Sequence, residues 1–471
     1  MTALYISAAH KSSGKTILSM GLCAALKNRG YSVQAFKKGP DYIDPAWLSL
    51  ASGKPCHNLD FFTSTTRFIQ SQFYHYAANN DVALVEGNKG LHDGLSLDGS
   101  DSNAALAKLL NLPVVLVLDS IGITRGIAPM LKGLQSFDPE VRVAGVILNK
   151  VAGSRHKSKL VAAVETYTDI PIFGVVGRDR SLELDERHLG LIPGNELGSE
   201  AGGFIQKLQA RVSEEVDLDN ILACKRTDSH DFKLQFYKKP KRSGLRIAIA
   251  RDQSFGFYYP ADLDRFAELG VILVDFDTST DAGLPGSIDG LLIGGGFPET
   301  KLRAISSNHA LLIDIKAKLS DGLPAYAECG GLMYLSRSIQ FNDLILPMVG
   351  TIPADVVMHK TPQGRGYVQL ESTPAHPWTG NPGTGLLNAH EFHYSSLANL
   401  APDTQFAYRV RRGHGIDGTN DGIMIGNLLA NYCHLRQTDT CEWVDQFVDF
   451  INQCKNSIHD DHDKQKRSQS N

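Results

Sequence analysis

Cys329 lies in a setting that is typical of an enzyme nucleophile. The segment 324-PAYAECGGLMYLS-336 contains a short apolar run that ends at Cys329, then two glycines, then an apolar stretch typical of a helix. Small neighbours permit the sharp strand-to-helix turn that exposes a nucleophilic side chain, and a helix N-terminus lowers the pKa of a thiol. An isolated cysteine is usually a core residue, but the glycine-rich surroundings favour a reactive thiol here.

Two further segments supply partners for such a thiol. The segment 428-LLANYCHLR-436 places His434 late in the chain, as expected of a general base that meets the cysteine only in the folded protein. In 294-GGGFPE-299, the backbone N–H groups of Gly295 and Gly296 could form an oxyanion hole for a tetrahedral intermediate. Two more histidines, a glutamate and a tyrosine gather in 389-AHEFHYSS-396, where structural roles and substrate contacts are equally compatible with the pattern.

A phosphate-binding pattern begins the chain. The segment 9-AHKSSGKT-16 fits G-x-x-x-x-G-K-[ST], except that Ala9 replaces the first glycine. In such a loop Gly14 and its neighbours offer N–H groups to phosphate oxygens, Lys15 adds a positive charge, and the Thr16 hydroxyl can ligate Mg²⁺. The pattern follows an apolar run and precedes an amphipathic stretch, so it predicts an ATP site with Mg²⁺.

A second oxygen ligand for Mg²⁺ is expected at the carboxyl end of a neighbouring strand, where open α/β sheets bind ligands. Glu86 ends the run 82-VALVE-86 and meets that requirement. The glycines of 86-EGNKGLHDG-94 would let the backbone approach the phosphates closely. The segment 37-KKGPDYIDP-45 also follows a predicted strand, but its spacing alone is equally consistent with a plain turn.

Two series of short apolar runs alternate with segments of helical length and must position these groups. Such continuous apolar strands predict an α/β fold with two doubly wound, mostly parallel sheets. We expect a nucleotide-binding domain over 1–195, a linker over 196–243, a second domain with the cysteine site over 244–440, and a C-terminal helix with a disordered tail over 441–471. The tail is predicted to be disordered from residue 455 because it is polar and has no aromatic residue.

Composition excludes several classes of function. The 471 residues carry a net charge of -4 and 42% hydrophobic residues, which gives no basic excess for binding nucleic acid. The longest apolar runs are far shorter than the ~20 residues that a membrane span needs, and the N-terminus lacks a signal pattern. We expect a cytoplasmic protein with small-molecule partners and, beyond them, at most a second copy of the chain.

Together these segments resemble the cobyrinic acid a,c-diamide synthases, which belong to the cobyric-acid type of class I glutamine amidotransferases. The likeness extends to about residue 440, and the N-terminal half is also similar to dethiobiotin synthetase. Its motifs are 37-KKGPDYIDP-45, 86-EGNKGLHDG-94, 138-DPEVRVAGVILNKV-151, 187-RHLGLIP-193, 294-GGGFPE-299, 327-AECGGLMYL-335, 364-GRGYV-368 and 390-HEFHYS-395.

The resemblance implies a carbon–nitrogen ligase. Cys329, activated by His434, would release ammonia from glutamine. ATP and Mg²⁺ would phosphorylate the a and c side-chain carboxylates of a tetrapyrrole, and ammonia would displace phosphate. The implied ligands of MgATP are Gly14, Lys15, Thr16 and Glu86, with Asn149 near the adenine and with Asp41, Tyr42 and Ile43 lining the pocket of the carboxylate substrate.

Departures from the family pattern leave two alternatives open. Position 436, where other class I enzymes carry glutamate, is Arg436, so the resemblance implies a Cys–His dyad. Near the presumed substrate, Asn88, Lys89 and His92 differ from the usual residues, which leaves sirohaem and nickel-sirohydrochlorin as alternatives to cobyrinate. A more remote alternative is a nucleotide-switched binding protein with an inactive glutaminase domain.

Overall fold

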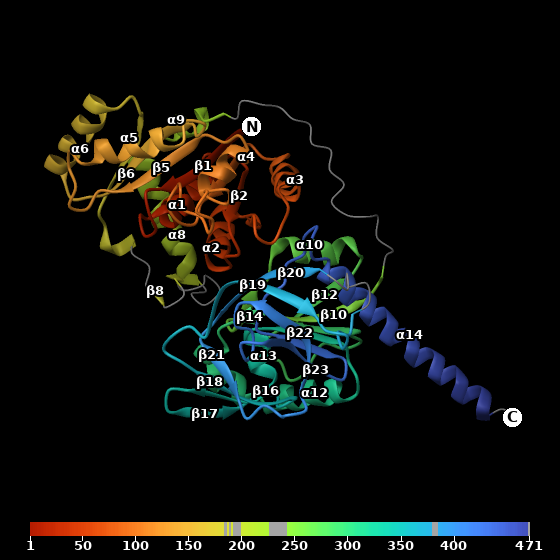
Figure 1. The fold of residues 1–471 in the computed structure, drawn as a ribbon. Coiled ribbons are helices and arrows are strands. Elements are labelled where there is room, and N and C mark those ends of the chain that lie inside the picture. The colour runs from red at the N-terminus through yellow and green to blue at the C-terminus, as the bar shows by residue number, and fades with distance from the viewer. Residues whose placement is uncertain (183–185, 188–189, 192–198, 226–242, 379–384, 470–471) are drawn as a thin grey trace. The chain divides into compact units, whose positions relative to one another are not determined.

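The computed structural model describes residues 1–182, 186–187, 190–191, 199–225, 243–378 and 385–469 (Figure 1). The chain forms two compact units, Met1–Phe236 and Tyr237–Asn471. The expected domain boundary at 195–196 and residues 226–242 of the expected linker lie outside the described residues.

The first unit is built on a seven-stranded sheet whose six strand pairings are all parallel. Across the sheet the strands are β3 (His57–Leu59), β2 (Val33–Lys38), β4 (Val82–Glu86), β1 (Thr2–Ala8), β5 (Val114–Asp119), β6 (Val143–Val151) and β7 (Ile172–Gly177). The helices that connect them are α1 (Lys15–Asn28), α2 (Ile43–Ser52), α3 (Thr66–Ala77), α4 (Asn103–Leu109), α5 (Ile127–Phe137) and α6 (Ser154–Tyr167). The predicted parallel sheet is confirmed for this unit, and its central strands are buried along their full length because helices cover them.

Part of the stretch that we expected to be a linker is helical. After the short elements η1 (Arg180–Leu182), β8 (Glu186–Arg187) and β9 (Gly190–Leu191) come α8 (Ser199–Glu215) and α9 (Leu218–Ala223). Helix α8 packs on α1, where Val212 lies so close to Gly21 that a Cβ atom would not fit. The linker interpretation is therefore wrong for 199–223. The sequence pattern is weak because only a narrow stripe of α8, including Leu208 and Val212, is apolar and buried.

The second unit contains a nine-stranded sheet of mixed character. In order its strands are β12 (Ile272–Phe276), β10 (Arg246–Ala250), β13 (Gly290–Ile293), β15 (Ala325–Glu328), β24 (Leu428–Asn431), β23 (Asn420–Ile425), β22 (Gln405–Arg412), β19 (Gly364–Ser372) and β20 (Leu386–His393). The pairings from β12 to β24 are parallel, and those from β24 to β20 are antiparallel. The expectation of a mostly parallel sheet therefore holds only for the first five strands, because the later strands pair without intervening helices.

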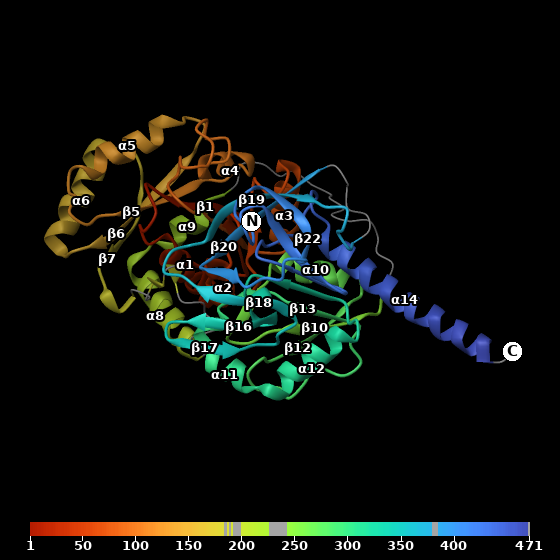
Figure 2. The same ribbon diagram turned by 60° about the horizontal axis from the view of Figure 1, so that its bottom comes forward.

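Smaller elements complete this unit. A four-stranded sheet contains β17 (Leu344–Pro347), β16 (Ser336–Phe341), β18 (Ile352–Met358) and β21 (Ser395–Ala398), and β11 (Phe255–Phe257) pairs with β14 (Gly295–Gly296). The helical elements are α10 (Pro260–Glu268), η2 (Pro298–Lys301), α11 (Leu302–Ser307), α12 (His309–Ser320), α13 (Gly330–Leu335) and α14 (Trp443–Gln469). Helix α11 packs against η2 and β17, and Figure 2 shows α12 next to α11.

The C-terminal segment differs from the prediction of a disordered tail. Helix α14 continues to Gln469, through most of the polar stretch that begins at residue 455. A helix forms its backbone hydrogen bonds within itself, so it can extend from a packed first part without burying further apolar surface. In the described part of the chain, no helix combines the length and the apolar character that crossing a membrane requires.

If α8 belongs to the first unit, a charge at its buried face should loosen that unit. We predict that Val212→Asp, at a site that is 1% exposed, destabilises the first unit by about 3 kcal/mol. Hydrogen exchange of peptides from α1 and α8 should accelerate, whereas Ser213→Asp, on the exposed face, should leave it unchanged. Equal protection in both variants would mean that α8 is a passive connector.

Candidate functional site

The phosphate loop joins β1 to α1 as the sequence pattern predicts. Gly14 precedes α1 with a left-handed backbone (φ 86°), and no side chain caps the helix, so its first N–H groups face the loop. Lys15 is 5% exposed and donates to the carbonyl of His10 at 3.3 Å. Burial, followed by repulsion from Lys37, lowers the pKa of Lys15 to about 8. This loop can bind an anion through backbone dipoles and one cation.

A compact group of charges lies beside this loop. The Thr16 hydroxyl donates to Glu86 Oε1 at 2.8 Å and lies 3.2 Å from Asp44 Oδ2. Lys37 Nζ lies 2.6 Å from both carboxylates. Lys37 and Glu86 are almost fully buried, and the two carboxylates outweigh the effect of burial and raise the pKa of Lys37. The buried lysine thus compensates carboxylates that would otherwise repel each other.

Sequence reasoning predicted Thr16 and Glu86 but missed Lys37 and did not assign Asp44. Lys37 belongs to β2, every residue of which is buried. A lysine inside a fully buried strand needs a buried counter-charge, and a lysine at the end of a predicted strand was the available signal. Asp44 stood in a segment that also resembled a plain turn.

The predicted substrate residues surround the start of α2. Asp41 Oδ1 accepts the backbone N–H groups of Ile43 at 2.9 Å and Asp44 at 3.2 Å, so Asp41 caps the helix that Tyr42 introduces. Burial and the neighbouring charge of Asp44 raise the pKa of Asp41 to about 7. These contacts place the three residues beside the charge group, and their contact with a substrate stays a prediction.

Asn149 lies under the phosphate loop. Its side-chain amide donates to the carbonyl of Ser13 at 2.9 Å and packs directly against Gly14. The neighbouring Lys150 donates to the carbonyl of Ser12 at 2.9 Å and to Asp119 at 2.8 Å. The end of β6 therefore supports the loop, while the expected contact with adenine stays a prediction.

In the second unit Cys329 occupies the turn between β15 and α13. Its φ of 46° is positive, which is unusual for a residue with a side chain and is typical of a strained turn that presents a nucleophile. The Cys329 N–H donates to the carbonyl of Asn431 at 2.7 Å, at the end of β24. This bond holds the turn against the strand that leads to His434.

His434 meets Cys329 as predicted. Burial alone would lower the pKa of His434, but hydrogen bonds to Cys329 and Glu328 outweigh burial and raise it to about 10. The Glu328 contact joins Oε2 to His434 Nδ1 at 3.2 Å. With a pKa of about 10, His434 is protonated at neutral pH. Sequence reasoning did not identify Glu328, although a carboxylate directly before the cysteine was visible.

The predicted oxyanion glycines lie against the same residues. A Cβ atom on Gly295 would come within 2.6 Å of His434 Cε1, and one on Gly330, the residue after the cysteine, would lie 3.0 Å from the Gly296 nitrogen. The backbone of β14 thus approaches both the turn and the histidine, which only glycine permits. The arrangement can offer N–H groups to an oxyanion at Cys329.

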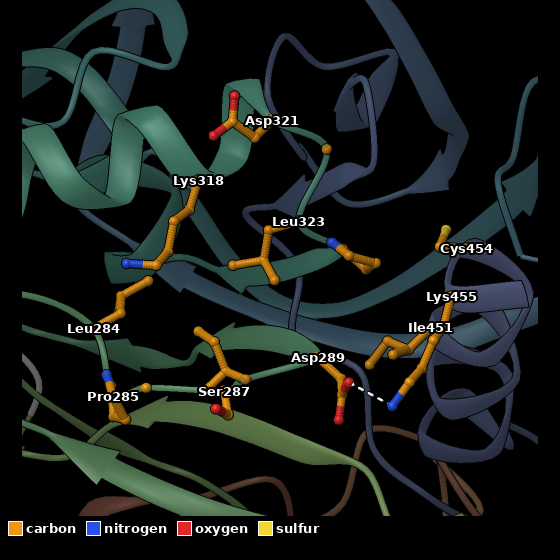
Figure 3. A pocket seen from close by; sticks show the side chains of 14 residues that line it. Leu284, Pro285, Ser287, Asp289, Lys318, Asp321, Leu323, Ile451, Cys454 and Lys455 are labelled. Carbon is orange, nitrogen blue, oxygen red and sulfur yellow. Dashed lines mark hydrogen bonds and ion pairs between the residues drawn. The ribbon is translucent and has the colours of Figure 1, made fainter. Parts of the chain in front are cut away.

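This unit also contains a pocket of about 390 Å³, which Figure 3 draws from close by and which Cys329 does not line. It is lined by residues 284–289 and 322–324, which precede β13 and β15, and by Ile451, Cys454 and Lys455 of α14. Lys455 bonds Asp289 at its rim. Cys329 and Gly295 follow the carboxyl ends of the same strands, so this pocket lies at the opposite edge of the sheet from the reactive residues.

Comparison with known proteins agrees with both sites. Residues 6–192 match the family described as CobQ/CobB/MinD/ParA nucleotide binding domain, and residues 246–439 match the CobB/CobQ-like glutamine amidotransferase domain. The chain is 42% identical to the cobyrinate a,c-diamide synthase of Magnetococcus marinus, with 94% of this chain and 95% of the relative covered. The chain belongs to the cobyrinate a,c-diamide synthase family. The enzymes of that name from Dehalococcoides mccartyi (40% identical, 92% and 94% covered) and Methanosarcina barkeri (35%, 95% and 95%) are further relatives.

Membership of the diamide synthase family confirms the resemblance, the α/β fold class and the presence of a glutamine amidotransferase domain beside a nucleotide-binding domain. The structure brings Cys329, His434, Gly295 and Gly296 together in one unit, and Lys15, Thr16 and Glu86 together in the other. The roles of the individual residues stay predictions.

The contact between Gly295 and His434 makes a testable prediction. In Gly295→Ala the new methyl group would displace the imidazole, and we expect glutamine hydrolysis to fall by about 100-fold or more. Gly286→Ala, in open space at the other edge of the sheet, is the matched control and should retain full activity. Equal glutamate release by the two variants would show that β14 does not restrain the histidine.

Proposed function

We propose that this protein converts cobyrinate to cobyrinate a,c-diamide, with ATP and glutamine as co-substrates. The observation that carries the proposal is that one chain contains both sites: a phosphate loop with acidic partners, and a cysteine turn with a histidine. The same chain aligns with named diamide synthases over nearly its full length. A nucleotide-switched binding protein would need only the first of these sites.

In the glutaminase half, the Cys329 thiolate attacks the side-chain amide carbon of glutamine. The backbone N–H groups of Gly295 and Gly296, with that of Gly330 close to them, stabilise the negative charge that develops on the oxygen. His434 gives its proton to the departing nitrogen, which leaves as ammonia. The remaining thioester reacts with water to give glutamate and free Cys329. The charged state of His434 at neutral pH supports this role.

In the synthetase half, Gly14 and Lys15 hold the phosphates of ATP, with Asn149 near the adenine and with Asp41, Tyr42 and Ile43 beside the tetrapyrrole. A substrate carboxylate oxygen takes the γ-phosphoryl group, which releases ADP, and ammonia then attacks the acyl phosphate and releases phosphate. Each cycle converts one carboxylate to an amide, so two cycles give the diamide.

Magnesium fits the oxygen atoms beside the phosphate loop. Thr16 and Glu86 offer hard oxygen ligands, and the buried Glu86 Oε2 has no hydrogen-bond partner among the residues that the structure describes. When bound there with ATP, the ion would neutralise charge on the phosphates. We further propose a cytoplasmic setting, where ATP and glutamine are available, and a homodimer as the assembly to test first.

The nitrogen source distinguishes the two halves. With cobyrinate, ATP and Mg²⁺, the wild-type protein should form the diamide from either glutamine or ammonium. Cys329→Ser should form it from ammonium only, because only the nitrogen supply is lost. Lys15→Ala should lose at least about 100-fold with both sources. Mass spectrometry of the corrinoid products measures all three.

Sirohaem and nickel-sirohydrochlorin belong in the same assay as competing substrates. Amidation of either one in place of cobyrinate would move the proposal to that tetrapyrrole. Amidation of none of the three, or loss of ammonium-dependent synthesis in Cys329→Ser, would contradict the proposed mechanism.

The metal assignment has its own test. Glu86→Gln removes a charged oxygen ligand, and we expect the Mg²⁺ concentration for half-maximal synthesis to rise about tenfold. Glutamine hydrolysis without the corrinoid should persist. Glu140→Gln, on the exposed surface of the same unit, is the control. An unchanged Mg²⁺ dependence in Glu86→Gln would remove Glu86 from the metal site.

A further inference from the structure

Glu328 is a buried carboxylate at the point where the chain turns toward the nucleophile. It is the last residue of β15, directly precedes Cys329, and is 6% exposed. Because side chains alternate along a strand, Glu328 points to the same side of the sheet as Tyr326. A carboxylate at such a site is stable only if both oxygens have partners.

The two oxygens of Glu328 have different partners. Oε1 accepts the N–H of Leu435 at 2.8 Å and the hydroxyl of Tyr326 at 2.6 Å, whereas Oε2 lies 3.2 Å from His434 Nδ1. The first pair of bonds already holds the carboxylate in place. The other oxygen, Oε2, is thereby directed at the imidazole of His434. Glu328 therefore does more than cap the backbone N–H of Leu435.

Strand pairing explains why these residues meet. Strands β15 and β24 are parallel neighbours, with Glu328 opposite Asn431. The chain continues from Asn431 for three residues to His434, which reaches the end of β15. The turn at Cys329, where φ is positive, separates the side chains of Glu328 and Cys329. Both side chains therefore contact the imidazole of His434.

The contact fixes the chemistry of the ring. With Nδ1 donating to Glu328, Nε2 is the nitrogen left for the Cys329 sulfur, which is the arrangement that a base for a thiol requires. The usual position for a carboxylate, two residues after the histidine, carries Arg436, whose guanidinium lies over the Tyr259 ring at 5.4 Å. Glu328, at the end of β15, therefore supplies the carboxylate that position 436 does not carry.

We propose that Glu328 is the positioning residue of His434, so that the reactive group is a Cys329–His434–Glu328 triad whose acid comes from the residue before the nucleophile. The inference rests on the proposed glutamine hydrolysis at Cys329 and replaces the dyad that the resemblance implied. The carboxylate sets the tautomer and orientation of the ring and stabilises its protonated form, without itself exchanging a proton.

Other ionisable groups near His434 do not provide this function. The His390 ring stacks on His434 at 4.9 Å, and burial followed by repulsion from His434 and Arg436 keeps its pKa far below the usual value. Arg436 has the same charge as imidazolium. Asp262 accepts the Gln437 N–H and the Trp443 indole N–H, and burial raises its pKa to about 8.

The test uses the full-length protein and Glu328→Gln, which preserves size and can still accept the Leu435 N–H. We expect kcat/KM for glutamine hydrolysis to fall by about 100-fold or more, while ammonium-dependent synthesis stays within about twofold. In histidine labelled with ¹³C at Cε1, the His434 signal, assigned with His434→Gln, should titrate at least about one pH unit lower than in the wild type. For Glu328→Asp, both kcat/KM for glutamine hydrolysis and the His434 titration should lie between the values of the wild type and of Glu328→Gln.

Glu391→Gln is the matched control, since Glu391 is a buried carboxylate of the same unit that binds the N–H groups of His414 and Gly415. It should not move the His434 titration. Full glutaminase activity in Glu328→Gln, an unchanged His434 titration, or equal loss of ammonium-dependent synthesis would each overturn the proposal. If the wild type hydrolyses no glutamine, the proposed function fails, whereas the titration still tests Glu328.

Discussion

The parallel pairing of neighbouring strands is the constraint on which both candidate sites depend. Strands that run in the same direction end at the same edge of a sheet, so residues far apart in sequence meet there. In the first unit β1, β2 and β4 bring Thr16, Lys37 and Glu86 together. In the second, the pairing of β15 with β24 brings Cys329 to His434.

Burial at these edges makes charge compensation the second requirement. A carboxylate or ammonium group that is withdrawn from water must have a partner of opposite charge or several hydrogen bonds. Lys37 meets this need for Glu86 and Asp44, and Glu328 meets it for His434. The same pairings raise the pKa of Lys37 and of His434, so one physical effect stabilises each site and sets its charge state.

Helices α8 and α14 lie where the composition of the sequence predicts a linker and a disordered tail. Helix α8 was interpreted as linker because most of its residues are polar, yet a narrow apolar stripe buries Val212 against α1. Helix α14 extends into a segment without aromatic residues because the hydrogen bonds of a helix are local. For α8, the spacing of a few apolar side chains was a better guide than total polarity.

The sequence alone determined the α/β class, the phosphate loop at Gly14–Thr16, the cysteine turn and the pairing of chemistries in one chain, because these depend on local patterns of glycine, charge and apolar runs. It could not identify Lys37 as the partner of Glu86, or Glu328 as the partner of His434. Those contacts join residues 49 and 106 positions apart. Only the tertiary structure decides them, since strand order and register, which no short segment encodes, determine which strand ends become neighbours.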